Sequence, residues 1–218
     1  MAVKVALFDF DGTLADTLPL AFRSFQSVFA KYDQRIVTKE ELVKMFGPTE
    51  DGILSANLAN ATVLADATRH FYDVYKQDHR QVVHPHPDIL SLLQTLKEHG
   101  IRIGVITGKS RRAYEISAEA LEMAPFFDLV ITGDDVERPK PDPEGVLKAM
   151  TTLNGHKEDT IFLGDSIADV KAGQAAGVRT FAVQWLSTSQ SSEFELSPEH
   201  IYRTVPPFLD WVFGENKE

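Results

Sequence analysis

The 218-residue sequence contains no cysteine at all, which excludes structural disulfides, thiol nucleophiles and cysteine-based zinc sites. No stretch reaches the roughly 20 apolar residues that a membrane span needs, and no apolar signal-peptide core precedes the first aspartate. Positive charge is also scarce, because 22 Lys and Arg against 32 Asp and Glu give a formal net charge of −10. That charge opposes binding to nucleic acid or to an acidic membrane surface. We therefore expect a cytoplasmic protein that binds neither nucleic acid nor membrane.

An apolar segment near the N-terminus ends in two aspartates. Residues 3–9 are rich in Val, Leu and Phe and predict a buried strand, after which Asp9 and Asp11 stand two positions apart. Residues at i and i+2 of an extended chain point to the same side, and Gly12 gives the backbone room to turn. Two carboxylates held together in this way require a metal cation, a shared proton or a cationic partner.

The rest of the chain divides into a helical part and an alternating part. Between residues 15 and 83 apolar periodicity predicts only helices, at about 18–32, from Thr38 with a capping box to Glu41, at 50–57 and at 61–80. The later residues predict strands at 101–106, 128–131, 160–163 and 178–183, alternating with helices at 87–99, 110–121, 143–153 and 167–176. The fold class is therefore α/β, with a Rossmann-like parallel-sheet core (1–14 and 84–218) and an inserted α-helical domain (15–83). The Ser-rich segment 187–192 is expected to be only a surface connection.

Polar residues follow the predicted strands at several of their carboxyl ends. Thr107 and Gly108 follow one strand, Lys140 lies between two prolines after another, and Asp165 and Asp169 follow a third. Carboxyl ends of parallel strands share one edge of the sheet, where open α/β sheets bind ligands. These side chains should therefore meet Asp9 and Asp11.

The charge of this set indicates its chemistry. Four carboxylates and one lysine are costly to gather without a divalent cation, and all-oxygen ligands favour Mg²⁺ over Zn²⁺. With Mg²⁺ bound, such a site suits the transfer of a phosphoryl group. One aspartate can act as nucleophile, and a second can donate and accept the proton.

Four segments, residues 9–14, 106–108, 140–141 and 164–169, resemble the motifs of the haloacid dehalogenase-like phosphatases in order and spacing. The helical insertion lies where that superfamily has its α-helical cap. The second aspartate, Asp11, fits the phosphatases, because the dehalogenase branch lacks it. Residues 46–49 further resemble a loop of the phosphoglycolate phosphatase and pyrophosphatase group, and residues 134–137, 140–143 and 183–185 resemble its pyrophosphatase branch most.

The resemblance implies a role for each matched residue. Asp9 would be the nucleophile and Asp11 the general acid and base, while Thr107 and Lys140 would hold the phosphoryl oxygens. The implied metal ligands and implied substrate contacts form two further sets. Mg²⁺ would be held by Asp9, Asp165 and the backbone carbonyl of Asp11, with Asp169 supporting the metal or Lys140, and the substrate would contact Gly12, Thr13, Gly47, Thr49 and Gly108.

Taken singly, several of these residues have a simpler interpretation. Thr107 could cap a helix, Lys140 could be an exposed loop lysine, and Asp169 could be a first-turn acid favoured by the helix dipole. His84 and His86, flanked by prolines, are better interpreted as a hinge segment than as a metal pair. The functional interpretation depends on the combination of all four motifs.

The sequence thus predicts a Mg²⁺-dependent phosphohydrolase, monomeric or homodimeric, that acts on a small anionic phosphomonoester resembling phosphoglycolate. An inorganic pyrophosphatase and a phosphosugar mutase of the same superfamily remain alternatives, and so does a phospho-accepting signalling domain.

Overall fold

A six-stranded parallel sheet forms the centre of the computed structural model, which describes residues 2–191, 193–194 and 197–214. The strand order is β3-β2-β1-β4-β5-β6, and every neighbouring pair is parallel, which confirms the predicted Rossmann-like α/β fold. The strands are β1 (Val5–Phe8), β2 (Arg102–Ile106), β3 (Leu129–Ile131), β4 (Thr160–Gly164), β5 (Arg179–Val183) and β6 (Ile201–Tyr202).

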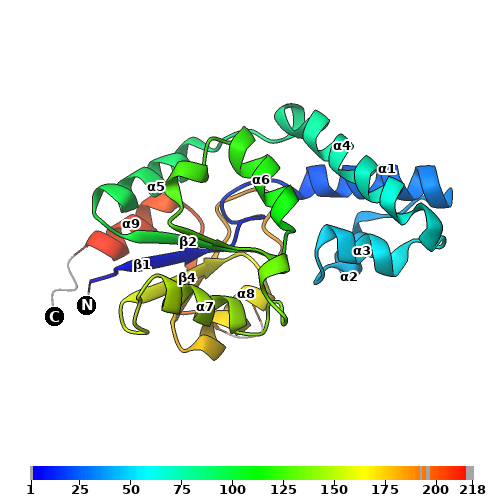
Figure 1. Ribbon diagram of the computed structural model, residues 1–218. Helices are drawn as coiled ribbons and strands as arrows, with labels where there is room; N and C mark the ends of the chain where they lie inside the picture. Colours follow the sequence, from blue (N-terminus) through cyan, green and yellow to red (C-terminus); the bar gives the residue numbers. More distant parts are fainter. Residues whose placement is uncertain (1, 192, 195–196, 215–218) are drawn as a thin grey trace.

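Helices cover both faces of the sheet, as Figure 1 shows. Alternate residues of β1 serve the two faces, because successive side chains of a strand point in opposite directions. Ala6 and Phe8 belong to one hydrophobic cluster, whereas Val5 and Leu7 belong to another. The first cluster includes α5 (Pro87–Glu98), α6 (Arg111–Ala120) and α9 (Val205–Phe213), and the second includes α7 (Glu144–Thr152) and α8 (Ile167–Ala176).

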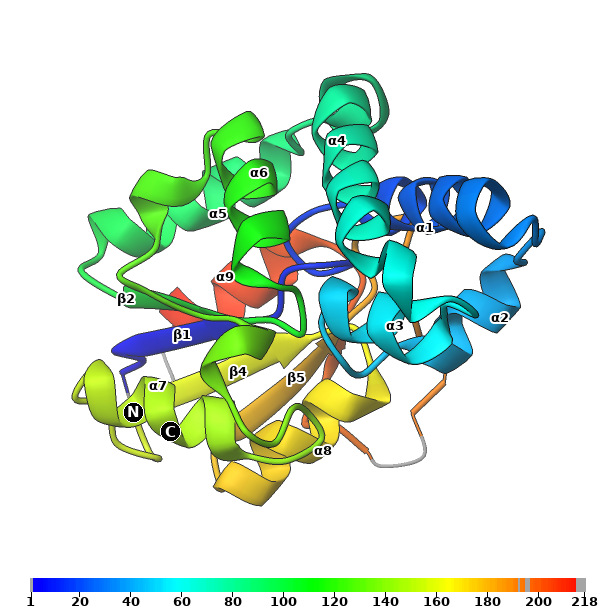
Figure 2. The same ribbon diagram turned by 45° about the vertical axis from the view of Figure 1, so that its right-hand side comes forward.

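Four helices between β1 and α5 lie beyond the carboxyl ends of the strands, as both ribbon views show (Figures 1 and 2). They are α1 (Leu18–Asp33), α2 (Lys39–Met45), α3 (Glu50–Asn57) and α4 (Leu64–Val82), and we call them the helical cap. The predicted capping box is present, since Thr38 accepts from the backbone of Glu41 and Glu41 accepts in return. Phe25 of α1 packs on Phe71 of α4 with ring centroids 4.6 Å apart. Apolar periodicity therefore places the inner face of the cap correctly.

The end of the chain contains two elements that the sequence reading missed. β6 adds a two-residue edge strand beside β5, and α9 begins at Val205 with prolines in its first turn. Proline is tolerated there because the first N–H groups of a helix have no partner within it. Among the described residues, no helix is both long and apolar enough to cross a lipid bilayer.

Candidate active site

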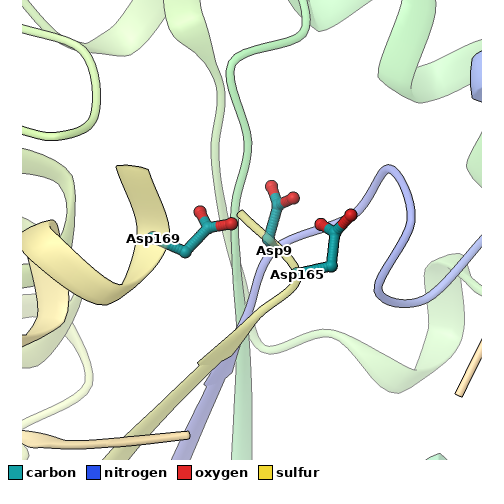
Figure 3. Close-up of side chains that lie close together, drawn as sticks. All are labelled: Asp9, Asp165 and Asp169. Atoms are coloured by element: carbon teal, nitrogen blue, oxygen red, sulfur yellow. The ribbon is translucent and has the colours of Figure 1, made fainter. Parts of the chain in front are cut away.

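Three buried aspartates meet at the carboxyl edge of the sheet. Asp9 follows β1, Asp165 follows β4, and Asp169 lies in the first turn of α8, with Asp9 between the other two in Figure 3. β1 and β4 pair in parallel with Phe8 opposite Leu163, so both strands end at the same level. One carboxylate oxygen from each aspartate lies within 4.8 Å of those of the other two. None of these residues is more than 4% exposed.

The protonation of this cluster is strongly perturbed. Burial raises the pKa of Asp9 to about 7, and the charges of Asp169 and Asp11 add to the rise while Lys140 opposes it. Burial also raises the pKa of Asp165 well above its usual range, and the charges of Asp9 and Asp169 reinforce this effect. Carboxylates that resist ionisation because they are buried, and also because they lie close together, need a cation to remain charged.

Lys140 supplies part of that positive charge. Its Nζ lies 2.6 Å from Asp9 Oδ1 and 2.6 Å from Asp169 Oδ1, and it donates to the Ile106 carbonyl at 3.0 Å. Burial alone would lower the pKa of Lys140, but the carboxylates of Asp169 and Asp9 outweigh it and raise that pKa above its ordinary value. One ammonium among three carboxylates leaves room for a divalent cation. The all-oxygen donor set is the kind that Mg²⁺ prefers.

Asp165 is held in place by neighbours on both sides. Its Oδ1 accepts a hydrogen bond from Thr13 Oγ1 at 3.2 Å, and its Oδ2 accepts from the Gln190 N–H at 2.6 Å. Gly12 has a φ of +80°, and a Cβ there would lie only 2.3 Å from Asp165 Oδ2. The close approach therefore needs a glycine at position 12 for both its conformation and its lack of a side chain.

The Ser-rich segment after β5 is more than the surface connection that we expected. Besides the Gln190 contact, the Ser191 N–H donates to the Asp165 carbonyl at 3.1 Å, and Thr188 Oγ1 donates to Asp16. Ser192, the last residue of that prediction, lies outside the described residues. Trp185 Nε1 donates to the Thr13 carbonyl at 2.7 Å. Residues 185–191 thus hold Asp165 of the acidic cluster in place, both directly and through Thr13.

Asp11 belongs to a second charged group that joins the core to the cap. Its Oδ1 accepts from Lys109 Nζ at 2.9 Å and from Thr17 Oγ1. Lys109 Nζ also lies 3.5 Å from Glu50 Oε1, and Glu50 Oε2 accepts from the Ser110 N–H at 2.7 Å. Burial would lower the pKa of Lys109, but Asp11, Tyr75 and Glu50 hold that pKa well above its ordinary value.

The sequence analysis did not identify Lys109 or Glu50 as site residues. Lys109 directly follows the Thr107-Gly108 motif, and this adjacency is a signal that would have drawn attention to it. Glu50 offers no such signal, because only the seating of the cap brings it to the loop after β2.

A cavity of about 370 Å³ lies between the acidic edge and the cap. Its floor is formed by Asp9, Asp11 and Lys140, and Gly47 and Gly108 of the predicted substrate contacts also line it. The cap side is largely apolar. Its lining residues there are Leu18, Ala21, Phe25, Phe46, Gly47, Pro48, Glu50 and Ile53.

Four of the residues predicted to contact the substrate or its phosphoryl oxygens do not line this cavity, and neither do Asp165 and Asp169. Thr107 is buried, and its hydroxyl accepts from the Lys109 N–H at 3.2 Å. Gly12 and Thr13 both lie against the side chain of Asp165. Thr49 caps α3, where its hydroxyl accepts from the Gly52 N–H at 3.4 Å. The predicted roles of these four residues remain predictions.

Comparison with known proteins identifies the family. The model for haloacid dehalogenase-like hydrolases matches residues 6–183. The pyrophosphatase PpaX of Bacillus mycoides is 30% identical over 209 residues, covering 96% of this chain and 96% of the relative. PpaX of Oceanobacillus iheyensis is 31% identical over 212 residues, covering 97% of this chain and 98% of the relative.

Solved structures agree with that result. A Bacteroides fragilis protein described as a haloacid dehalogenase-like hydrolase superposes with a TM-score of 0.77 at 31% identity, covering 94% of this chain and 99% of that one. CbbY from Rhodobacter sphaeroides, solved with phosphate, superposes with a TM-score of 0.79 at 24% identity, covering 93% and 95%. The second likeness shows the fold alone. The chain therefore belongs to the haloacid dehalogenase-like hydrolase family.

Proposed function

We propose that this enzyme is a Mg²⁺-dependent phosphohydrolase that releases phosphate from a small phosphomonoester through an aspartyl-phosphate on Asp9. The observation that carries the proposal is the floor of the cavity, where Lys140 bridges Asp9 and Asp169 at 2.6 Å each, with Asp165 alongside. A nucleophilic carboxylate, a fixed ammonium and an oxygen-rich cation site are the parts that phosphoryl transfer uses.

The proposed metal ligands are Asp9, Asp165 and the backbone carbonyl of Asp11, with Asp169 nearby. When bound there, Mg²⁺ would offset the negative charge of the entering phosphoryl group and of the carboxylates. The lysine bridge gives Asp169 a supporting role, since Asp169 fixes the ammonium of Lys140 beside Asp9.

In the first half of the proposed reaction, a carboxylate oxygen of Asp9 attacks phosphorus. The bond from phosphorus to the leaving-group oxygen breaks, and that oxygen takes its proton from Asp11. Lys109 and Thr17 both donate to Oδ1 of Asp11, which positions the carboxyl group. Lys140 and Thr107 compensate the charge on the phosphoryl oxygens.

In the second half, a water oxygen attacks phosphorus while Asp11 accepts the proton of that water. The bond between phosphorus and Asp9 breaks, so inorganic phosphate leaves and the carboxylate of Asp9 is restored. The cap narrows access to the cavity during the transfer, which keeps bulk water away from the first step.

The test is Asp9→Asn, which removes the attacking oxygen while the side chain keeps its shape. We expect phosphate release to fall by about 10³-fold or more, the scale seen when a nucleophile is lost, while the circular dichroism spectrum stays unchanged. Asp73→Asn, at an exposed position on α4, is the matched control and should retain full activity. Substantial turnover by Asp9→Asn would sink the mechanism.

Inorganic pyrophosphate is the second candidate substrate, because relatives about 30% identical over nearly the whole chain are named pyrophosphatases. A phosphate-release assay with Mg²⁺ over pyrophosphate, phosphoglycolate and alkyl phosphates, whose leaving group is uncharged, separates the two. Rapid release from pyrophosphate alone would favour the second candidate. The same assay tests a mutase or a phospho-accepting domain, since neither releases phosphate with each turnover.

A further inference from the structure

Glu50 is a buried carboxylate in the cavity wall that the proposed mechanism does not use. It begins α3 of the cap and is only 5% exposed, although Asp51 beside it faces solvent. Hydrogen bonding from the Ser110 N–H at 2.7 Å holds its Oε2 against the core loop after β2. The cap therefore brings a fixed negative charge to the cavity wall near Asp11, the proposed proton donor to the leaving group.

The two lysines that line the cavity are both already paired. Lys140 lies between Asp9 and Asp169, and Lys109 lies between Asp11 and Glu50. Among the described residues that line the cavity, no other side chain is cationic. No unpaired cationic side chain of this lining is therefore left to receive a second anionic group of a substrate.

The remaining cap wall is apolar, and Phe25, Phe46 and Ile53 represent it. An anionic leaving group placed there would lose its water without gaining an ionic partner, which is costly. It would also meet the like charge of Glu50, and like charges brought close together oppose binding. An uncharged group would instead pack against the aromatic and aliphatic side chains.

We infer that Glu50 is a specificity-determining residue that excludes a second negative charge, so that the substrates are phosphomonoesters with an uncharged leaving group. The inference rests on the proposed function and narrows its substrate class. It makes both phosphoglycolate and pyrophosphate poor substrates. Glu50 has a second effect as well. It pairs with the ammonium of Lys109 and so weakens the attraction of that ammonium for an anionic leaving group.

The experiment compares kcat/KM for propyl phosphate, phosphoglycolate and pyrophosphate with Mg²⁺. We expect the wild-type enzyme to prefer propyl phosphate by about tenfold or more. Glu50→Gln removes the charge but keeps an oxygen that accepts from Ser110. In that variant we compare kcat/KM for phosphoglycolate or pyrophosphate, whose leaving groups are charged, with kcat/KM for propyl phosphate. This ratio should rise about tenfold, mainly because the KM for the substrate with the charged leaving group falls.

Glu40→Gln is the matched control, because it makes the same substitution at an exposed position in the first turn of α2, within the same cap and away from the cavity. We expect its substrate ratios to equal those of the wild type. Equal kcat/KM of the wild type for substrates with charged and with uncharged leaving groups would overturn the inference. Identical shifts of the kcat/KM ratio in the two variants would also overturn it. Absence of phosphate release from all three substrates by a folded wild-type enzyme would overturn the proposed function itself, which keeps the two failures distinct.

Discussion

His79 should make the stability of this protein fall between pH 7 and pH 5. The imidazole lies on α4 and is 1% exposed, with Nε2 3.0 Å from Ser117 Oγ of α6. Its Nδ1 finds no hydrogen-bond partner among the described residues. Burial lowers the pKa of His79 to about 4, and the nearby charges of Lys109 and Arg80 act in the same direction.

The sign and size of the effect follow from that pKa. The folded protein holds His79 neutral, whereas the unfolded chain binds a proton near its ordinary pKa of 6.5. The stability that depends on neutral His79 is therefore fully present above pH 6.5. It is lost as the pH falls toward 4, because protonation then favours the unfolded chain. The loss is about 2 kcal/mol of unfolding free energy at pH 5, and it approaches about 3 kcal/mol below pH 4.

Urea unfolding at pH 7.5, 6.5, 5.5 and 5.0 measures this loss when the wild type is compared with His79→Gln. The variant keeps a group that can bond to Ser117 but cannot be protonated, so its stability should depend less on pH by about 2 kcal/mol. His84→Gln removes an exposed imidazole and controls for the loss of a histidine as such. Parallel pH profiles for the wild type and His79→Gln would refute the reasoning.

Two further predictions concern the acidic cluster. Gly12→Ala should lower the unfolding free energy by about 1–2 kcal/mol and weaken Mg²⁺ activation of phosphate release, because the new Cβ strains a φ of +80° and meets Asp165 Oδ2 at 2.3 Å. Gly100→Ala measures the backbone strain alone, because Gly100 has a φ of +73° and a Cβ there would have no atom within 4 Å. An equal loss of unfolding free energy in both variants would contradict the proposed clash with Asp165. Mg²⁺ at about 100 times its dissociation constant should add about 2.7 kcal/mol of stability, seen as a higher melting temperature that EDTA reverses. Asp165→Asn should lose most of that increase, and an undiminished increase would place the cation elsewhere.

The meeting of these side chains at the sheet edge was predictable from sequence because it depends on local patterns. β1, β2 and β4 are short apolar runs that end abruptly in polar residues, and parallel strands bring their carboxyl ends to one edge. Asp9, Asp165 and Lys140 therefore meet although they are far apart in the chain. The prediction that these residues meet required neither the order of the strands nor the position of the cap.

The contacts that depend on tertiary seating were not predictable in this way. Glu50 reaches Ser110 only because the cap packs over the loop after β2, and Gln190 reaches Asp165 only because the segment after β5 folds back. The hydroxyl of Thr49, a predicted substrate contact, caps its own helix, and Thr49 does not line the cavity, so its predicted role stays a prediction. The short β6 was missed because two residues carry too little periodicity to be recognised.

The hydrogen bond from Trp185 to the Thr13 carbonyl also gives the chain an optical probe of its own. Trp185 is one of only two tryptophans in the sequence, and Thr13 in turn donates to Asp165. Two hydrogen bonds thus separate an indole ring from the carboxylate cluster. We expect a displacement of Asp165 to change the surroundings of that ring, so intrinsic fluorescence should report on the occupancy of the site without any added label.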